Sequence, residues 1–418
     1  MLDKIPESNT FCILPWLHFH ALPNKKVLPC CMANSDLPVS TTDKESVIEM
    51  MNTEEYKQLR KNMLDGTNSD CCNRCYDVER VGQWSLRQSA NAVRGNRNID
   101  LVNATNDDGS IDTFKLQYVD IRWSNICNFK CRSCGPEFSS LHAKEFIEHK
   151  GGVEKLKQYF RMDDMVVSCN ETGDFFDKVK PYLKDTDEVY FAGGESLITN
   201  EHYKMLDEWI ALGNTDIRLT YTTNFSVFKF KGKNVIDYWK KFKNVQIFAS
   251  LDGMGKNLEY LRSGADWAEI EDNIKMLKEH VPHVKFNLTP TISVWNAWHF
   301  PDFFDYMVKN NYIDPTDQDC IRLNMLTNPW WANVGVLPSF YKDRLFLKWN
   351  KIKMNPAYCV SVQNSAAMVQ EALKGEPRAD GLKEFFEIQA ETDKLRNEDL
   401  LDSIPELEDV LEWTEENS

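Results

Sequence analysis

The feature that most restricts the fold of this chain is a regular alternation of strand and helix patterns that begins at residue 116. Short β-branched and aromatic runs alternate with longer segments of helical periodicity, which is typical of parallel strands joined by crossover helices. The predicted strands are residues 116–123, 188–192, 217–222, 245–251, 285–293 and 321–326, and the helices between them begin near Phe138, Phe175, Asn200, Asn234, Trp267 and Phe300. This pattern predicts an α/β fold, a partial (β/α)6 TIM-like barrel over residues 112–330.

Short motifs stand at the ends of four of these predicted strands. Three cysteines at the spacing CxxxCxxC follow the first strand, Gly193-Gly194-Glu195 follows the second, Asn224 follows the third, and SLDG, residues 250–253, closes the fourth. In parallel α/β folds the carboxyl ends of the strands gather at one edge, where the chemistry usually takes place. Each motif alone is also typical of a tight turn, but their occurrence at successive strand ends favours one shared site.

The three cysteines with this spacing are Cys127, Cys131 and Cys134, which lie within eight residues of one another. Three such thiolates are able to bind three irons of a cubane cluster and leave the fourth iron without a protein ligand. An open iron of this kind can bind a substrate or a cosubstrate. The triplet therefore predicts a cluster that takes part in chemistry.

A second group of cysteines lies closer to the N-terminus. Residues 16–19 and 26–28 are predicted to form two short strands joined by a turn at Pro23-Asn24, and residues 45–64 to form one or two helices. This region contains Cys12, Cys30, Cys31, Cys71, Cys72 and Cys75. Four of these thiolates would form a closed site for either zinc or an iron–sulfur cluster, and spacing alone does not choose between them. His18 and His20 are alternative ligands, but histidines in an aromatic strand are more often packed or hydrogen-bonded.

Composition limits the class of protein further. The 418 residues are 42% hydrophobic and include 64 acidic and 49 basic side chains, which predicts a globular protein that does not bind nucleic acid through a general basic surface. No apolar run approaches the ~20 residues that cross a bilayer, and the N-terminus lacks the layout of a signal peptide, so we expect a cytoplasmic protein. Disulfides are not expected in that reducing compartment, and the isolated Cys169, Cys320 and Cys359 are expected to be packing residues.

Three further segments leave alternatives open. Residues 77–115 form either a solvated connector or part of a substrate or cofactor entrance that would use Arg80, Arg87, Arg94 and Arg97. Residues 149–186 form either a lid over the barrel mouth or a surface decoration. Residues 331–418 are expected to be a helical C-terminal extension, with helices over residues 338–354, 361–374 and 381–396. Its end, residues 398–416, contains nine acidic and no basic residues and is either an amphipathic helix folded on the body or a solvated tail.

The motifs at the strand ends resemble those of the radical S-adenosylmethionine (SAM) enzymes. The resemblance rests on the CxxxCxxC triplet, the GGE segment at residues 193–195 and the SLDG segment at residues 250–253. It implies that the triplet holds a [4Fe–4S] cluster whose free iron binds SAM, and that reductive cleavage of SAM yields a 5'-deoxyadenosyl radical. It also implies that SAM is bound by Gly193, Gly194, Glu195, Asn224, Ser250, Asp252, Arg262 and Ile292. The residue before the third cysteine is Ser133, where the family usually has a larger apolar residue beside the adenine.

The N-terminal segments FCILPW, VLPCCMAN and CCNRCY resemble the auxiliary-cluster modules known as SPASM and twitch domains. Here the module, residues 1–100, precedes the triplet rather than following the barrel. The resemblance implies a second [4Fe–4S] cluster with Cys12, Cys30, Cys72 and Cys75 as ligands and with Cys31 and Cys71 as neighbouring alternatives. Zinc is the competing interpretation of this site.

These resemblances imply an oxidoreductase or modifying enzyme that abstracts hydrogen from its substrate. The first hypothesis for the substrate is a residue of a peptide or protein, and the second is a small molecule such as a sugar, nucleotide or amino acid. A third hypothesis, a non-catalytic iron–sulfur electron-transfer protein, leaves the GGE and SLDG segments unexplained. The expected partners are the substrate and a reductant such as flavodoxin or ferredoxin, and neither a membrane nor nucleic acid is expected.

Overall fold

The computed structural model describes residues 3–417, which divide into two compact units. The first unit contains the chain up to Cys127, then Pro136–Thr220 and Lys241–Asn244. The second contains Asn128–Gly135, Tyr221–Lys240 and residues 245–417. No helix within residues 3–417 is long and apolar enough to cross a membrane.

The sheet of the first unit joins the cysteine-rich hairpin to the predicted barrel strands. Its strands are β1 (His18–Ala21), β2 (Lys26–Leu28), β3 (Ser40–Thr41), β4 (Tyr118–Ile121), β6 (Glu188–Phe191) and the beginning of β7 (Arg218–Thr223), in the order β3-β2-β1-β4-β6-β7. The hairpin is antiparallel, as predicted, with His20 opposite Leu28. Strand β1 also pairs in parallel with β4, with His18 opposite Tyr118, which the sequence did not predict.

The two faces of this sheet differ in chemistry because side chains alternate along each strand. One face is aromatic, since Phe19 and Trp123 both pack on Phe175, at centroid distances of 6.3 and 5.7 Å. The opposite face carries His20 and Asp120, whose Nδ1 and Oδ2 atoms are 3.1 Å apart. Polar side chains therefore line one face of the parallel strands, and the apolar core lies under the other.

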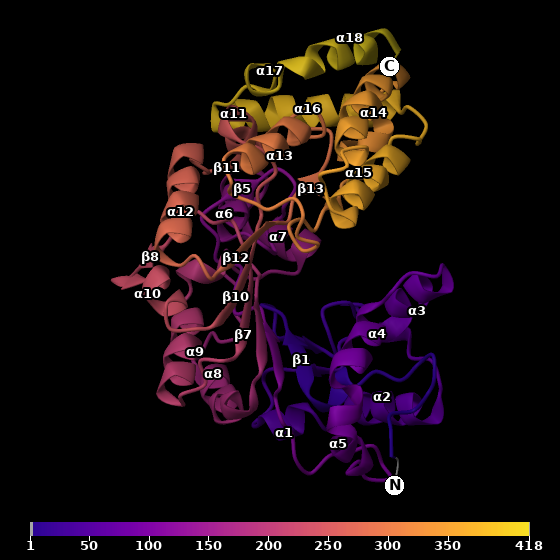
Figure 1. The fold of residues 1–418 in the computed structure, drawn as a ribbon, viewed down its shortest axis with the longest axis vertical. Helices are drawn as coiled ribbons and strands as arrows, with labels where there is room; N and C mark the ends of the chain where they lie inside the picture. The colour runs from indigo at the N-terminus through magenta and orange to yellow at the C-terminus, as the bar shows by residue number, and fades with distance from the viewer. Residues whose placement is uncertain (1–2, 418) are drawn as a thin grey trace. The chain divides into compact units, whose positions relative to one another are not determined.

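The helices of the first unit begin close to the predicted positions. They are α1 (Val47–Met50), α2 (Glu54–Asp65), α3 (Asn73–Arg80), α4 (Leu86–Ala90), α5 (Ile99–Asn103), α6 (Ser140–His149), α7 (Gly152–Phe160), α8 (Asp174–Val179) and α9 (Asn200–Ala211). Helices α2 to α5 lie together next to β1 (Figure 1). Helix α7 belongs to the predicted insertion, where Ala143, Leu156 and Met162 form a small core of their own.

Residues 77–115 are not a solvated connector at their buried arginines, and Arg87 is one of the residues that line a cavity of the first unit. Helices α4 and α5 and the short turns between them fill much of this stretch, and Arg87 and Arg94 are 6% and 4% exposed. Arg87 pairs with Glu79, and Arg94 pairs with Asp187 and Glu188. Composition missed this because a buried arginine with carboxylate partners looks the same in sequence as a solvated one.

The second unit continues the parallel arrangement. Strand β7 is followed by β10 (Asn244–Ala249) and β12 (Lys285–Leu288), and β10 pairs with β12 in parallel. The smaller strands are β5 (Lys130–Cys131), β8 (Lys229–Phe230), β9 (Lys233–Asn234), β11 (Arg262–Ser263), β13 (Thr291–Ile292) and β14 (Asn324–Met325). The α/β class with parallel strands and crossover helices is confirmed.

The last two predicted strands are shorter than expected. The strand predicted over residues 285–293 is broken into β12 and β13, because Pro290 has no N–H to donate and the N–H of Thr291 bonds the side chain of Asp252. The strand predicted over residues 321–326 is reduced to β14 and a bridge between Leu288 and Ile321.

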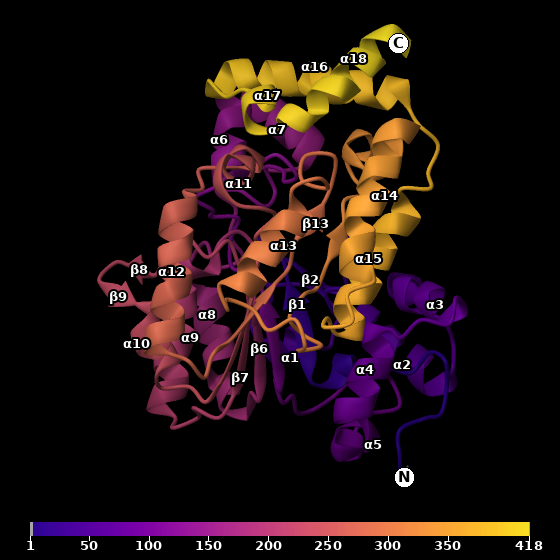
Figure 2. The same cartoon turned by 45° about the horizontal axis from the view of Figure 1, so that its top comes forward.

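Helices make up most of the second unit. They are α10 (Val235–Trp239), α11 (Gly255–Leu261), α12 (Trp267–His280), α13 (Phe300–Lys309), α14 (Ser339–Lys353), α15 (Val360–Ala372), α16 (Ala379–Arg396), α17 (Leu400–Ser403) and α18 (Glu408–Asn417). Helices α17 and α18 lie along α16 (Figure 2). The acidic end is therefore folded on the body rather than solvated, since Leu400, Ile404, Leu407 and Val410 are buried. The isolated Cys169, Cys320 and Cys359 are buried as expected.

Candidate functional site

One cavity of the first unit collects the four cysteines expected to bind a second cluster. Cys12, Cys30, Cys72 and Cys75 all line it, together with Arg87 and apolar side chains. Cys12 comes just before a short helical turn, Cys30 follows β2, and the other two lie at the start of α3, where they are three residues apart on one helical turn. The hairpin and the helix therefore bring together thiols that are up to 63 residues apart in the sequence.

The two neighbouring cysteines do not line this cavity. Cys31 is exposed, and Cys71 has its Sγ 3.8 Å from that of Cys72. Burial raises the pKa of the Cys12 thiol to about 12, although the backbone N–H of Leu14 opposes the shift. Burial also raises the pKa of Cys30 well above its usual value. Without a cation these thiols stay protonated, so metal binding here releases protons.

The donor atoms of this cavity are all thiols. Within residues 3–417, a search for three or more cysteine, histidine or acidic side chains grouped to hold a metal ion finds none. Four thiols around one cavity suit both zinc and a cubane cluster, so the arrangement supports a thiolate site and does not choose its metal.

The two histidines of β1 are held by strand β4. His18 stacks on Tyr118 with 4.4 Å between the ring centroids, and its Nδ1 lies 2.8 Å from the Tyr118 carbonyl oxygen. Burial lowers the pKa of His18 to about 4, so its ring is neutral near pH 7. His20 pairs with Asp120. Both residues are placed as the packing interpretation expects.

The beginning of the cysteine triplet is fixed by Asn125, which sequence reasoning missed. Its side-chain amide donates to the carbonyl oxygens of Pro136 and Met165, both at 3.0 Å, and accepts from the N–H of Val167 at 3.0 Å. The N–H of Cys127 donates to Ser140 Oγ at 3.3 Å. The only sequence signal was a polar residue directly after a predicted strand.

The GGE segment lies against the same stretch of backbone. A Cβ atom at Gly194 would lie 2.2 Å from the carbonyl oxygen of Ile126, so only glycine fits there. The N–H of Glu195 donates to that same oxygen at 2.7 Å. Glu195 is 1% exposed, and its carboxylate accepts from the N–H of Leu197 at 3.0 Å. In the first unit, the structure therefore brings Gly193, Gly194 and Glu195 directly beside the residue before Cys127.

In the second unit, Cys131 lies beside the predicted SAM ligands Arg262 and Asp252. Strands β5 and β11 pair Cys131 with Arg262, whose Nη1 is 3.7 Å from the Cys131 Sγ. Arg262 Nε donates to the buried Asp252 at 2.7 Å, and the second oxygen of Asp252 accepts from the N–H of Thr291 at 2.8 Å. Burial alone would lower the pKa of Arg262, but the Asp252 charge raises it above its usual value. This pair places a positive charge next to the Cys131 thiol.

The remaining predicted SAM ligands occupy different surroundings. Asn224 donates to the side-chain oxygen of Asn128 at 2.9 Å, which ties the end of β7 to the cysteine loop. The N–H of Ser250 donates to the Thr223 carbonyl oxygen at 2.8 Å. Ile292 is fully buried in β13. The roles of these residues toward SAM stay predictions.

Comparison with family models identifies two domains of the chain. The model of the radical SAM superfamily matches residues 121–307, and the model of an iron–sulfur cluster-binding domain named SPASM matches residues 12–76. The chain therefore carries a radical SAM domain and a SPASM domain. Members of this superfamily are enzymes that use a [4Fe–4S] cluster with SAM, and SPASM domains bind further iron–sulfur clusters. Both resemblances noted in the sequence are confirmed.

Solved structures give weaker similarity. Native anSMEcpe with bound AdoMet and the Cp18Cys peptide is 18% identical, with a TM-score of 0.33 over 56% of this chain and 58% of that one. Native anSMEcpe with bound AdoMet is 17% identical, with a TM-score of 0.38 over 57% of this chain and 62% of that one. The chain thus spans less than two thirds of these proteins, and similarity at this level carries no argument about function. A search of curated proteins gives no match.

Proposed function

We propose that the chain is an enzyme that reductively cleaves SAM and abstracts hydrogen from a residue of a peptide or protein. The observation that carries the proposal is the GGE segment packed on the backbone just before Cys127, with Gly194 in contact with Ile126. The backbone of Gly194 and Glu195 thus lies against the residue that precedes the first cysteine, and the Glu195 side chain is buried. A tight turn alone would not need to lie against the cysteine loop.

The proposed roles follow from the chemistry of each side chain. Cys127, Cys131 and Cys134 hold the [4Fe–4S] cluster, which together with SAM supplies the 5'-deoxyadenosyl radical. Glu195 offers its carboxylate as acceptor to the methionyl ammonium, Gly193 and Gly194 allow the backbone to approach SAM closely, and Asn224, Ser250 and Ile292 border the ribose and adenine. Arg262, oriented by Asp252, offers a fixed guanidinium to the methionyl carboxylate and to the Cys131 thiolate.

We assign the second site to an auxiliary [4Fe–4S] cluster bound by Cys12, Cys30, Cys72 and Cys75. The support is the cavity that these four thiols share and that Cys31 and Cys71 do not line. All four positions lie within the matched SPASM domain. An auxiliary cluster can accept the second electron of a substrate oxidation or bind the substrate directly, and both uses suit a peptide substrate.

The partners and the compartment follow from this chemistry. Reductive cleavage of SAM needs an electron donor of low potential, and a flavodoxin or ferredoxin in the cytoplasm would fill that role. The chain has a formal net charge of -15 and therefore repels a small acidic donor overall, so such a donor would dock on a local basic patch.

The test is formation of 5'-deoxyadenosine from SAM by the anaerobically reconstituted and reduced protein. The wild-type chain should form it, Cys131→Ala should reduce it to background, and Cys320→Ala, at a buried cysteine outside both sites, should retain it. Equal rates in the wild type and Cys131→Ala would contradict the proposal. Deuterium-labelled peptide pools and small-molecule pools then separate the substrate classes, because only a true substrate transfers its deuterium to 5'-deoxyadenosine.

A further inference from the structure

The residue between the second and third cysteines, Arg132, has an unusual environment for a side chain in a cofactor loop. It is 9% exposed, although its neighbours Cys131 and Ser133 are more accessible. A buried guanidinium is costly unless its donors are satisfied and its charge is balanced. The contacts of Arg132 therefore show what the loop is attached to.

All three nitrogen atoms of the Arg132 guanidinium, and its flat face, contact residues of the second unit. Its Nε donates to the Tyr260 carbonyl oxygen at 3.0 Å, and its Nη1 donates to Gln389 Oε1 at 2.8 Å. Its Nη2 donates to Asp393 and to Glu398, both at 2.5 Å. The guanidinium also lies over the Tyr260 ring, 3.6 Å from the centroid.

The acceptors are themselves held in place. Tyr260 donates its hydroxyl to Asp393 at 2.9 Å, and the backbone N–H of Leu400 donates to the other oxygen of Asp393 at 2.9 Å. Ser263 Oγ donates to Glu398 at 2.7 Å. Trp295 Nε1 donates to Gln389 at 3.2 Å. These bonds fix the carboxylates and the amide before Arg132 is added, so the end of α16 presents a preformed receptor for one guanidinium.

A second arginine binds the loop from the same helix. Arg396, the last residue of α16, donates from Nη1 to the carbonyl oxygen of Lys130 at 2.9 Å. The loop is thus attached to the end of α16 on both sides of Cys131, through the Lys130 backbone and the Arg132 side chain. The partners on α16 are more than 250 residues from the loop in the sequence.

We propose that Arg132 is a positioning residue for the radical-site cluster and that the C-terminal helix α16 is therefore a working part of that site. By locking the backbone between Cys131 and Cys134, the Arg132 contacts fix the directions of two cluster thiolates. This inference rests on the proposed function. Lysine is a poor replacement, because a single ammonium cannot reach the carbonyl oxygen, the amide and both carboxylates at once.

The test compares Arg132→Met, Arg132→Lys and the control Arg344→Met in the full chain. Arg344 pairs with Asp409 at 2.7 Å within the same unit, but its side chain is 52% exposed and makes no contact with the cysteine loop. The measurements are iron content, the EPR spectrum of the reduced radical-site cluster with and without SAM, and its midpoint potential. The auxiliary cluster in the same sample serves as an internal reference.

We expect Arg132→Met to bind the radical-site cluster about 10-fold more weakly or worse, as for other residues that orient metal ligands, with a changed SAM-induced EPR shift. Arg132→Lys should recover thermal stability but only part of the SAM response, and Arg344→Met should match the wild type. If Arg132→Met does not fold, Glu398→Gln provides the same readouts with a smaller expected change.

If Arg132 only stabilises the fold, its variants should have a lower melting temperature. The cluster in the folded fraction should then keep the midpoint potential and the SAM response of the wild type. That result would overturn the inference, as would full recovery by lysine. If the wild-type protein itself shows no SAM-responsive cluster, the proposed function fails and the inference fails with it. If the wild-type cluster responds to SAM and the Arg132 variants behave like the wild type, the inference about Arg132 fails and the proposed function stands.

Discussion

At the scale of single residues, the tightest fit in the described site is the approach of Gly194 to the backbone of Asn125 and Ile126. The backbone of Gly194 does not need a left-handed conformation, and its requirement for glycine comes from space alone, because the atoms that a Cβ would meet belong to the main chain. Main-chain atoms cannot rotate away as the end of a side chain can. Any added methyl group must therefore move the turn or the start of the cysteine loop.

We predict that Gly194→Ala destabilises the protein by about 2 kcal/mol, the usual cost of an overpacked site, and weakens SAM binding. Urea unfolding and SAM titration of the reconstituted protein measure the two effects. Gly213→Ala is the matched control, since Gly213 has a positive φ of 69° with open space around its Cβ position. It should cost about 1 kcal/mol from backbone strain and leave SAM binding unchanged. Equal effects of the two variants on SAM binding would contradict the close-packing argument.

The sequence identified the residues that carry motifs and missed those that act through distant contacts. Spacing singled out the triplet, GGE and SLDG, because a local pattern is visible without the fold. Arg132 and Asn125 carry no such pattern. Arg132 bonds Gln389 and Asp393 on α16, more than 250 residues away. Asn125 bonds Pro136, Met165 and Val167. The function of a polar side chain depends on which partners the fold brings to it, and one sequence does not contain that information.

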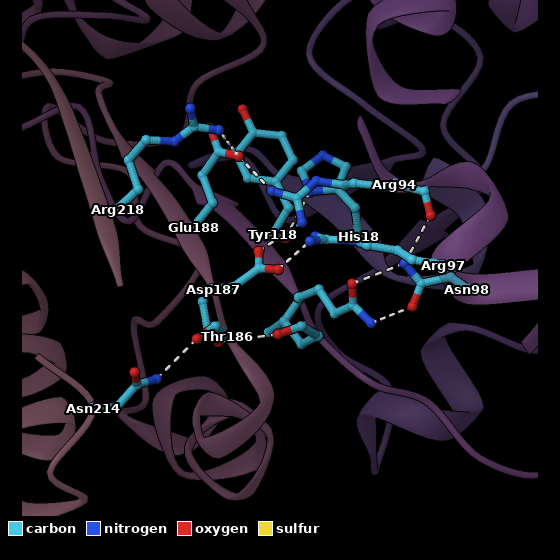
Figure 3. Close-up of polar contacts among 12 residues, drawn as sticks. His18, Arg94, Arg97, Asn98, Tyr118, Thr186, Asp187, Glu188, Asn214 and Arg218 are labelled. Carbon is cyan, nitrogen blue, oxygen red and sulfur yellow. Dashed lines mark hydrogen bonds and ion pairs between the residues drawn. The ribbon is translucent and has the colours of Figure 1, made fainter. Parts of the chain in front are cut away.

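At the scale of elements, the short turns between helices α4 and α5, residues 91–98, are attached to the beginnings of the parallel strands by a polar network (Figure 3). Arg94 is its centre, with Nη1 at 2.6 Å from Asp187, a second ion pair to Glu188, and its guanidinium 5.7 Å from the Tyr118 ring. Arg97 contacts the same Asp187 from the surface. The starts of parallel strands face away from the edge where the motifs gather, so this network is expected to contribute stability rather than chemistry.

We predict that Arg94→Met lowers the free energy of unfolding by about 2 kcal/mol, less than for a fully buried pair because its carboxylate partners are partly exposed. Arg97→Met removes a guanidinium from the same carboxylate, but the Arg97 side chain is 49% exposed. It should cost less than about 1 kcal/mol. Urea denaturation of the two variants tests the contrast. Similar losses for both would show that burial of Arg94 does not strengthen its ion pairs.

Element prediction succeeded where a repeating pattern was long and failed where pairing was decided by neighbours. The predicted starts of the crossover helices were close, and for the long helices α9, α12 and α13 an amphipathic stretch of ten or more residues determines its own period. Strand β1 was recognised in its hairpin but not as a neighbour of β4, because pairing partners are not marked in the sequence. The strand predicted over residues 321–326 is shortened for a related reason, because only its β14 portion pairs with a neighbouring strand, β13.

At the scale of the whole molecule, the cysteines form two proposed cluster sites with different surroundings. The four SPASM cysteines are enclosed by the first unit, whereas Cys131 lies beside the Arg262–Asp252 pair in the second. A closed site with four protein thiolates favours electron transfer or structure, and an open site with three favours chemistry on a bound ligand. This contrast supports the proposal of one reactive and one supporting cluster.

The last prediction concerns how many irons each site holds. The wild-type protein should bind about eight irons per chain, and a variant lacking the triplet, or one lacking the four SPASM cysteines, should bind about four, as one remaining cubane requires. The double variant Cys31→Ser, Cys71→Ser is the matched control and should keep about eight irons, because neither side chain lines the cavity. Iron and zinc analysis after anaerobic reconstitution measures all four proteins. Loss of iron in the control would show that Cys31 or Cys71 is a cluster ligand. Stoichiometric zinc in the triplet variant would show that the second site is a structural zinc site and not an auxiliary cluster.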